Sequence, residues 1–218
     1  MYTRVRNTLA ARSCTMSRFP EARFLVSAAA AAQFPPDEGA EVAFAGRSNA
    51  GKSSAINAIV HRHALARTSK APGRTRLLNF FEIVPQGRIV DLPGYGYASA
   101  PESERRTWAP LIDALRARSS LFGLFLIVDA RRGISAADEE LIAWTDPQER
   151  GVHVLLSKVD KLTRNEGARL LKTARAQVAE EVSVQLFSAH AATGVAEAQS
   201  KLAQWLQSRS NKKDPGNL

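Results

Sequence analysis

The sequence predicts an α/β fold with a doubly wound, mostly parallel sheet and one antiparallel hairpin at the edge of that sheet. An apolar run at residues 41–46 leads into a glycine-rich turn and then into a helical pattern at 52–61. Two strand-like runs, 76–84 and 87–92, are joined by the short sequence PQG, which favours a hairpin. Farther along, apolar runs alternate with helical patterns, the order that gives right-handed crossovers and parallel strands.

The later elements follow from the same patterns. Residues 121–130 form an unbroken apolar run, as expected of a central parallel strand covered on both faces, and the runs at 152–160 and 182–189 repeat it. Ligands of such sheets bind at the carboxyl ends of the strands, so binding residues are expected in the loops that follow them. Helices are expected from Pro101 and Glu102 through Leu115, and at 136–144, 166–180 and 197–208.

Length and composition are those of one folded domain. The chain has 218 residues, of which 44% are hydrophobic and 23% charged, and no apolar run approaches the roughly 20 residues that cross a bilayer. We expect a single domain at 21–209, a basic, flexible N-terminal arm at 1–20 and a flexible polar tail at 210–218. The arm contains arginines and no acid, a composition that flexible basic arms share with organellar transit peptides.

The net charge of +9 points toward polyanionic partners. A positive surface attracts nucleic acid, and a solvated basic surface without a dedicated partner is the alternative. Cys14 is the only cysteine, which excludes an internal disulfide and fits a reducing cytoplasm. Metal-ligand spacing is lacking around the histidines, which are expected at the surface or at helix ends: His61, His63, His153 and His190.

The sequence GRSNAGKS at residues 46–53 matches the phosphate-binding pattern G-x-x-x-x-G-K-[ST] between a predicted strand and a predicted helix, as that motif requires. Backbone N–H groups and the helix N-terminus would form an anion cradle, Gly51 would let the backbone close on the phosphates, and Lys52 would reach the β and γ oxygens. Ser53 would bind Mg²⁺. The predicted nucleotide contacts here are Gly46, Arg47, Ser48, Asn49, Ala50, Gly51, Lys52, Ser53 and Ser54.

A second motif, SKVD, follows the strand-like run that ends near residue 157 and indicates guanine recognition. The carboxylate of Asp160 can accept hydrogen bonds from the N1–H and the exocyclic amino group of guanine, and adenine offers no such pair of donors. Farther on, the backbone N–H groups of Ser188 and Ala189 could contact the guanine carbonyl. The predicted base contacts are Ser157, Lys158, Asp160, Lys161, Phe187, Ser188 and Ala189.

Two loops between these motifs are suited to sensing the γ-phosphate. In DLPG, Asp91 would hold Mg²⁺ through water and Gly94 would donate a backbone N–H to the γ-phosphate. In KAPGRTR, Thr75 precedes a strand and can close over the same metal. The predicted metal residues are therefore Ser53, Thr75 and Asp91. Further nucleotide contacts are expected from Gly73, Arg74, Leu92 and Pro93, and the predicted catalytic residues are Lys52, Thr75, Gly94 and Asn49.

With these motifs in this order, the chain resembles the translation-factor-like GTPases, and among them the EngB family, over roughly residues 21–209. The resemblance is carried by GRSNAGKSSAINAI, KAPGRTRLLNFF, VDLPGYGYA, IVDARRGISAAD and SKVDKL, and PPDEGAEVAFAGRSNAGKSS is similar to proteobacterial members, which disfavours a transit peptide. It implies a three-layer P-loop GTPase fold and a cytoplasmic bacterial protein. It also implies a role in large ribosomal subunit assembly, with a requirement in cell division and septation.

Two residues depart from common GTPase patterns. Ser157 stands where the family usually carries threonine, so we expect it to hold the loops less firmly and guanine affinity to be modest. Tyr95 stands where many small GTPases carry the glutamine that orients the attacking water. A rigid ring cannot reproduce the amide contacts, so we expect slow intrinsic hydrolysis and an aromatic side chain that is free to move with the switch.

Another group must then stabilise the negative charge that develops on the phosphates in the transition state. Asn49 is one candidate, because related GTPases with asparagine at this position bind K⁺ there. Arg74 is a candidate arginine finger, with an ordinary solvated loop arginine as the alternative. An rRNA partner that orders the switch loops is a third.

Two functions stay open at this point. One is a monomeric GTP-hydrolysing switch that binds rRNA or the large ribosomal subunit. The other is a protein-directed regulator of the division septum, for which the basic charge is incidental. An ATP-dependent kinase is disfavoured by Asp160.

Overall fold

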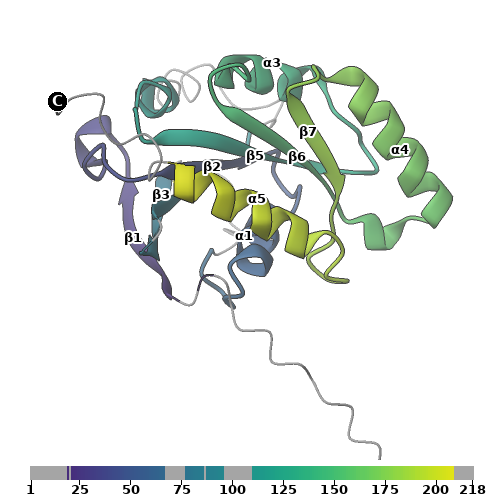
Figure 1. Cartoon of the computed structure of the whole chain (residues 1–218), viewed down its shortest axis with the longest axis horizontal. Helices are drawn as coiled ribbons and strands as arrows, with labels where there is room; N and C mark the ends of the chain where they lie inside the picture. The colour runs from purple at the N-terminus through teal and green to yellow at the C-terminus, as the bar shows by residue number, and fades with distance from the viewer. Residues whose placement is uncertain (1–18, 20, 67–76, 86, 96–109, 209–218) are drawn as a thin grey trace, which may run out of the picture.

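A seven-stranded sheet in the order β1-β3-β4-β2-β5-β6-β7 forms the centre of the protein (Figure 1). The computed structural model describes residues 19, 21–66, 77–85, 87–95 and 110–208. The hairpin of β3 and β4 is antiparallel, and β4, β2, β5, β6 and β7 pair in parallel, so the predicted fold class is confirmed. The strands are β1 (Glu21–Ala28), β2 (Glu41–Gly46), β3 (Leu78–Val84), β4 (Gly87–Asp91), β5 (Leu121–Asp129), β6 (Gly151–Ser157) and β7 (Val182–Leu186).

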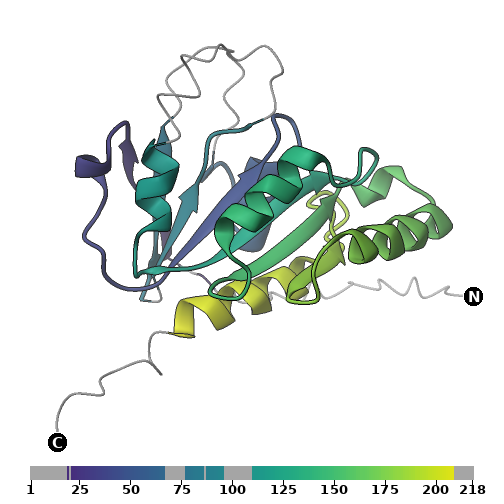
Figure 2. The same ribbon diagram turned by 90° about the horizontal axis from the view of Figure 1, so that it is seen from above.

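Helices cover both faces of this sheet and make three layers (Figure 2). One apolar core lies under α1 and α5 and includes Ile56 and Trp205; the other lies under the helical residues 110–116, α3 and α4 and includes Leu115 and Ala174. The predicted helix start at Pro101 and Glu102 lies outside the described residues. The helices are α1 (Lys52–Ile59), α3 (Ala136–Thr145), α4 (Arg164–Gln177) and α5 (Val195–Gln207), with single 3₁₀ turns at η1 (Ala31–Gln33) and η2 (Val159–Lys161).

The strand β1 was not predicted, and it places a further antiparallel strand outside the hairpin. It pairs with β3, for example Phe24 with Phe81, and the register shifts at a bulge between Phe24 and Val26. The bulge breaks the alternation of buried and exposed side chains and leaves Phe24 and Leu25 exposed side by side. Without a period of two, the sequence pattern gave no strand signal here.

No helix in the described part of the chain has the length and apolar character needed to cross a membrane.

His153 lies inside the sheet, which corrects the expectation of a surface or helix-end position. It is 2% exposed on β6. Its Nε2–H donates to Gln185 Oε1 at 2.7 Å, because an amide oxygen only accepts, and its Nδ1 accepts from Ser183 Oγ at 2.6 Å. Burial lowers the pKa of His153 to about 4. The imidazole is therefore neutral in the folded protein at pH 7.

This buried imidazole should make the protein sensitive to acid. A folded-state pKa below that of the unfolded chain gives stability that is complete above about pH 6.5 and lost as the pH falls toward 4. We expect a loss of about 2 kcal/mol from this group between pH 7 and pH 5. Urea unfolding at both pH values should show that His153→Leu lacks this component and that His190→Gln, at an exposed position, retains it. Equal losses in all three proteins would contradict the assignment.

Candidate functional site

The phosphate loop connects the carboxyl end of β2 to the first residue of α1. Gly51 has φ 102°, a left-handed conformation that favours glycine, and it turns the chain into the helix at Lys52. The loop is fixed at its start, where Ser48 N–H donates to Tyr95 C=O at 3.1 Å and Ala50 N–H donates to Arg47 C=O at 2.9 Å. The sequence therefore places a helix N-terminus at the end of a central strand, as anion binding requires.

Lys52 and Asp91 meet at this loop and form a buried ion pair. Their side chains are 13% and 8% exposed. Burial raises the pKa of the Asp91 carboxyl above its ordinary value, while the charge of Lys52 and hydrogen bonds from Lys52 and Asn79 act in the opposite direction. The ion pair with Lys52 places this carboxylate at the phosphate loop, beside a cation.

The SKVD segment holds the phosphate loop from behind. Ser157 Oγ donates to Ala50 C=O at 2.6 Å, so the serine hydroxyl reaches the loop. Lys158 Nζ donates to Asn49 C=O at 2.5 Å and to Asp129 Oδ2 at 3.0 Å. Both residues thus tie the phosphate site to the segment predicted to read the base.

Asp160 is exposed at the end of this segment. Ser188 Oγ donates to Asp160 Oδ1 at 2.6 Å, and this bond holds the pKa of Asp160 below its ordinary value. The carboxylate is therefore ionised at neutral pH and oriented by the loop that follows β7. A fixed carboxylate beside a phosphate loop can accept two N–H groups from a guanine base.

The loop after β7 gives two of the predicted base contacts structural partners, and their contact with the base stays a prediction. The N–H of Ser188 donates to Thr193 C=O at 3.0 Å, so this amide serves the loop itself and the Ser188 hydroxyl serves Asp160. Phe187 is 1% exposed in the core, so its ring supports the loop from below. Ala189 remains a predicted contact of the guanine carbonyl.

Comparisons with known proteins agree with this geometry. A family model described as "50S ribosome-binding GTPase" matches residues 41–158. The chain is 51% identical to a "Probable GTP-binding protein EngB" of Aromatoleum aromaticum over 88% of this chain and 90% of that protein. It is 46% identical to the protein of the same name in Coxiella burnetii, over 87% of this chain and 95% of that one.

The chain belongs to the EngB family of GTP-binding proteins. The fold agrees: a crystal structure of a "probable GTP-binding protein engB" superposes with a TM-score of 0.63 at 22% identity, over 78% of this chain and all of that one. A crystal structure of Era in complex with MgGDPNP and nucleotides of 16S ribosomal RNA superposes with a TM-score of 0.57 at 20% identity, over 77% of this chain and 57% of that one.

An EngB-family GTPase binds guanine nucleotide, typically with Mg²⁺, and the residues here fit such a metal. Ser53 and Asp91 offer oxygen donors at the phosphate loop, and the ammonium of Lys52 already pairs with that carboxylate. Among the described residues, no group of three or more His, Cys, Asp or Glu forms a metal cluster. Phosphate oxygens and water would complete the shell, as is usual for Mg²⁺. When bound, the metal would neutralise charge on the β- and γ-phosphates.

Three predicted nucleotide contacts, Gly73, Arg74 and Thr75, lie outside the described residues and stay predictions. Ala50 and Leu92 are buried, so any contact with nucleotide would come from their main chain. The predicted contacts among the described residues lie at or after the carboxyl ends of β2, β4, β6 and β7, and their contact with nucleotide stays a prediction.

The Tyr95 side chain has a partner on α3 in the described structure, and its expected movement with the switch stays a prediction. Its hydroxyl donates to Asp138 Oδ1 at the first turn of α3. Asp138 is 1% exposed and also accepts from Ser135 N–H and Oγ, at 2.8 and 2.6 Å. Burial, and then the charge of Asp138, raise the pKa of the Tyr95 phenol well above its ordinary value. The ring is thus docked on α3.

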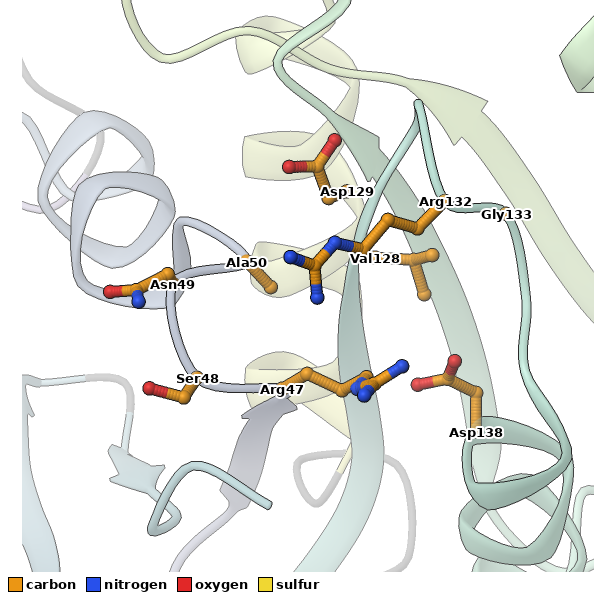
Figure 3. A pocket seen from close by; sticks show the side chains of 9 residues that line it. All are labelled: Arg47, Ser48, Asn49, Ala50, Val128, Asp129, Arg132, Gly133 and Asp138. Atoms are coloured by element: carbon orange, nitrogen blue, oxygen red, sulfur yellow. The ribbon is translucent and has the colours of Figure 1, made fainter. Parts of the chain in front are cut away.

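Sequence reasoning missed Asp129 and Asp138, which hold Lys158 and Tyr95. They line a small pocket behind the phosphate loop, where Arg132 reaches toward the loop and Arg47 toward Asp138 (Figure 3). Each aspartate had a signal: Asp129 ends an apolar strand, and Asp138 stands three residues after Ser135 in a capping pattern.

Tyr95→Phe should separate docking from catalysis. Because the hydroxyl serves Asp138, its removal should cost about 1.5–3 kcal/mol of unfolding free energy and leave the GTP hydrolysis rate within about twofold. Urea unfolding and phosphate release check both values. A tenfold fall in the rate with unchanged stability would place the hydroxyl in the reaction instead.

Proposed function

We propose that this chain is a slow GTP-hydrolysing switch in assembly of the large ribosomal subunit. The supporting observation is the distribution of charge along the chain. Acidic and basic side chains nearly balance among the described residues, and the excess positive charge lies mainly in residues 1–18 and 67–76, which contain no acid. The second stretch includes Thr75, the predicted sensor of the γ-phosphate. Charge that attracts RNA thus adjoins, in sequence, the residue expected to distinguish GTP from GDP.

Slow hydrolysis is part of this proposal. The residue after DLPG has no amide to orient water, and the hydroxyl of Tyr95 is held by Asp138. The missing electrostatic stabilisation would come from K⁺ at Asn49, from Arg74, or from the ribosomal partner. A protein of this kind acts through the nucleotide that it holds. The switch works only if the partner binds the GTP state and the GDP state with different affinities.

The remaining features of the proposal follow from the same role. The protein acts as a monomer in the cytoplasm, through the single domain at 21–209, and uses Mg²⁺ bound by Ser53, Thr75 and Asp91. Defective large subunits would account for a requirement in cell division and septation. The family description "50S ribosome-binding GTPase" supports the partner.

Co-sedimentation with purified large ribosomal subunits tests the proposal. The affinity of the protein for the subunit should differ by about tenfold or more between the complex with a non-hydrolysable GTP analogue and the complex with GDP. The tighter of the two should weaken as salt rises from about 50 to 200 mM. Equal binding in both nucleotide states would refute the switch. A salt-insensitive complex with a protein in place of the subunit would favour the regulator of the division septum.

A further inference from the structure

A row of polar side chains runs across three strands to the phosphate site. Ser27 on β1 lies opposite Asn79 on β3, and Asn79 lies opposite Asp91 on β4. Ser27 Oγ donates to Asn79 Oδ1 at 2.6 Å, and Asn79, the cross-strand partner of Asp91, acts through its side chain to lower the pKa of the Asp91 carboxyl. The row begins on the edge strand of the sheet and ends at the ion pair with Lys52.

The direction of these bonds fixes the orientation of the Asn79 amide. A carboxylate only accepts, so the amide NH₂ must face Asp91. Its oxygen then faces β1, where the Ser27 hydroxyl donates to it. Ser27 reinforces this orientation, because in the flipped one the amide oxygen would face the carboxylate and would lose the hydrogen bond from Ser27.

The row matters most when the partners of Lys52 change. In the described structure Asp91 has two side-chain partners, Lys52 and Asn79. A bound nucleotide would draw the ammonium of Lys52 toward its phosphates, and Asn79 would then be the partner that stays. The Asp91 side chain is 8% exposed, so few water molecules can replace a lost donor.

We infer that Asn79, oriented by Ser27, is a positioning residue that keeps the Asp91 carboxylate aimed at the Mg²⁺ of the nucleotide complex. Partners of this kind orient metal-binding carboxylates, and their loss typically lowers metal affinity by about 10–100-fold. The inference makes β1 part of the metal site. It rests on guanine nucleotide binding with Mg²⁺ and not on the ribosomal partner. The inference and the proposed ribosomal role can therefore fail independently.

Magnesium titration of the GDP complex tests this inference without using hydrolysis. Binding of a fluorescent GDP is measured in EDTA and across a range of Mg²⁺ concentrations. Asn79→Leu should raise the apparent Kd for Mg²⁺ by about tenfold or more, with GDP affinity in EDTA within about twofold of the unmodified protein. Ser27→Ala should shift the Mg²⁺ Kd in the same direction by less, and Asn79→Gln should restore part of it.

Glu82→Gln is the matched control, because Arg23 and Glu82 also pair across β1 and β3, at 2.6 Å, away from Asp91. It should leave the Mg²⁺ Kd unchanged. An unchanged Mg²⁺ Kd in Asn79→Leu, or an equal loss of GDP affinity with and without Mg²⁺, would overturn the inference. Should Asn79→Leu fail to fold, an unchanged Mg²⁺ Kd in Ser27→Ala would overturn it as well.

Discussion

Replacing Asp160 by asparagine is expected to lower the affinity for GDP by about 100-fold or more and to transfer selectivity to xanthosine diphosphate. The carboxylate is ionised, because Ser188 holds its pKa low, and it can accept both N–H donors of guanine. An asparagine amide presents an NH₂ to one of those donors. Xanthine carries a carbonyl where guanine carries the amino group, so the same NH₂ would then find an acceptor.

Calorimetric titration with GDP, xanthosine diphosphate and ADP measures this change. Glu180→Gln, which neutralises another exposed carboxylate, serves as the control and should bind GDP as the unmodified protein does. Two results would refute base recognition by Asp160: ADP bound as tightly as GDP by the unmodified protein, or GDP bound equally by the variant and the unmodified protein.

The nucleotide-binding motifs could be located from the sequence because they lie at the carboxyl ends of strongly apolar strands. Lys52 follows the run 41–46 and Asp160 follows the run 152–157, so the parallel topology alone brings them to one edge of the sheet. The contacts that hold these residues are different in kind. The bonds from Lys158 to Asp129 and from Tyr95 to Asp138 join residues far apart in the chain, and no local pattern specifies such pairs.

The failures have a common physical origin in tertiary context. The edge strand β1 has a bulge that removes the alternation of buried and exposed side chains. His153 is buried because Gln185 on the neighbouring strand accepts its hydrogen bond, whereas its residue type alone would place it at the protein surface. The start of α4 shows the opposite case. Its cap, Thr163 with Glu166, has the sequence pattern T-x-x-E. The helix begins at residue 164, two residues before the start at 166 that the apolar pattern predicted.

Removing Lys52 should damage both the binding site and the fold. Lys52→Ala deletes the cation that reaches the phosphates, so GTP and GDP binding should fall below detection by calorimetry. It also leaves Asp91 buried with Asn79 as its remaining side-chain partner. Loss of one member of a buried ion pair typically destabilises a protein by about 3–5 kcal/mol, so urea unfolding at pH 7 should show a loss of that order.

The double variant Lys52→Ala/Asp91→Ala separates these two effects. It removes the unpaired carboxylate, so it should regain most of the lost stability and none of the nucleotide affinity. The loss in the single variant should also shrink at pH 5, because burial raises the pKa of Asp91 and a protonated carboxyl needs no cation. If the single variant unfolds with the same free energy as the unmodified protein at pH 7, the ion pair contributes nothing to the fold, and Lys52 acts on the phosphates alone.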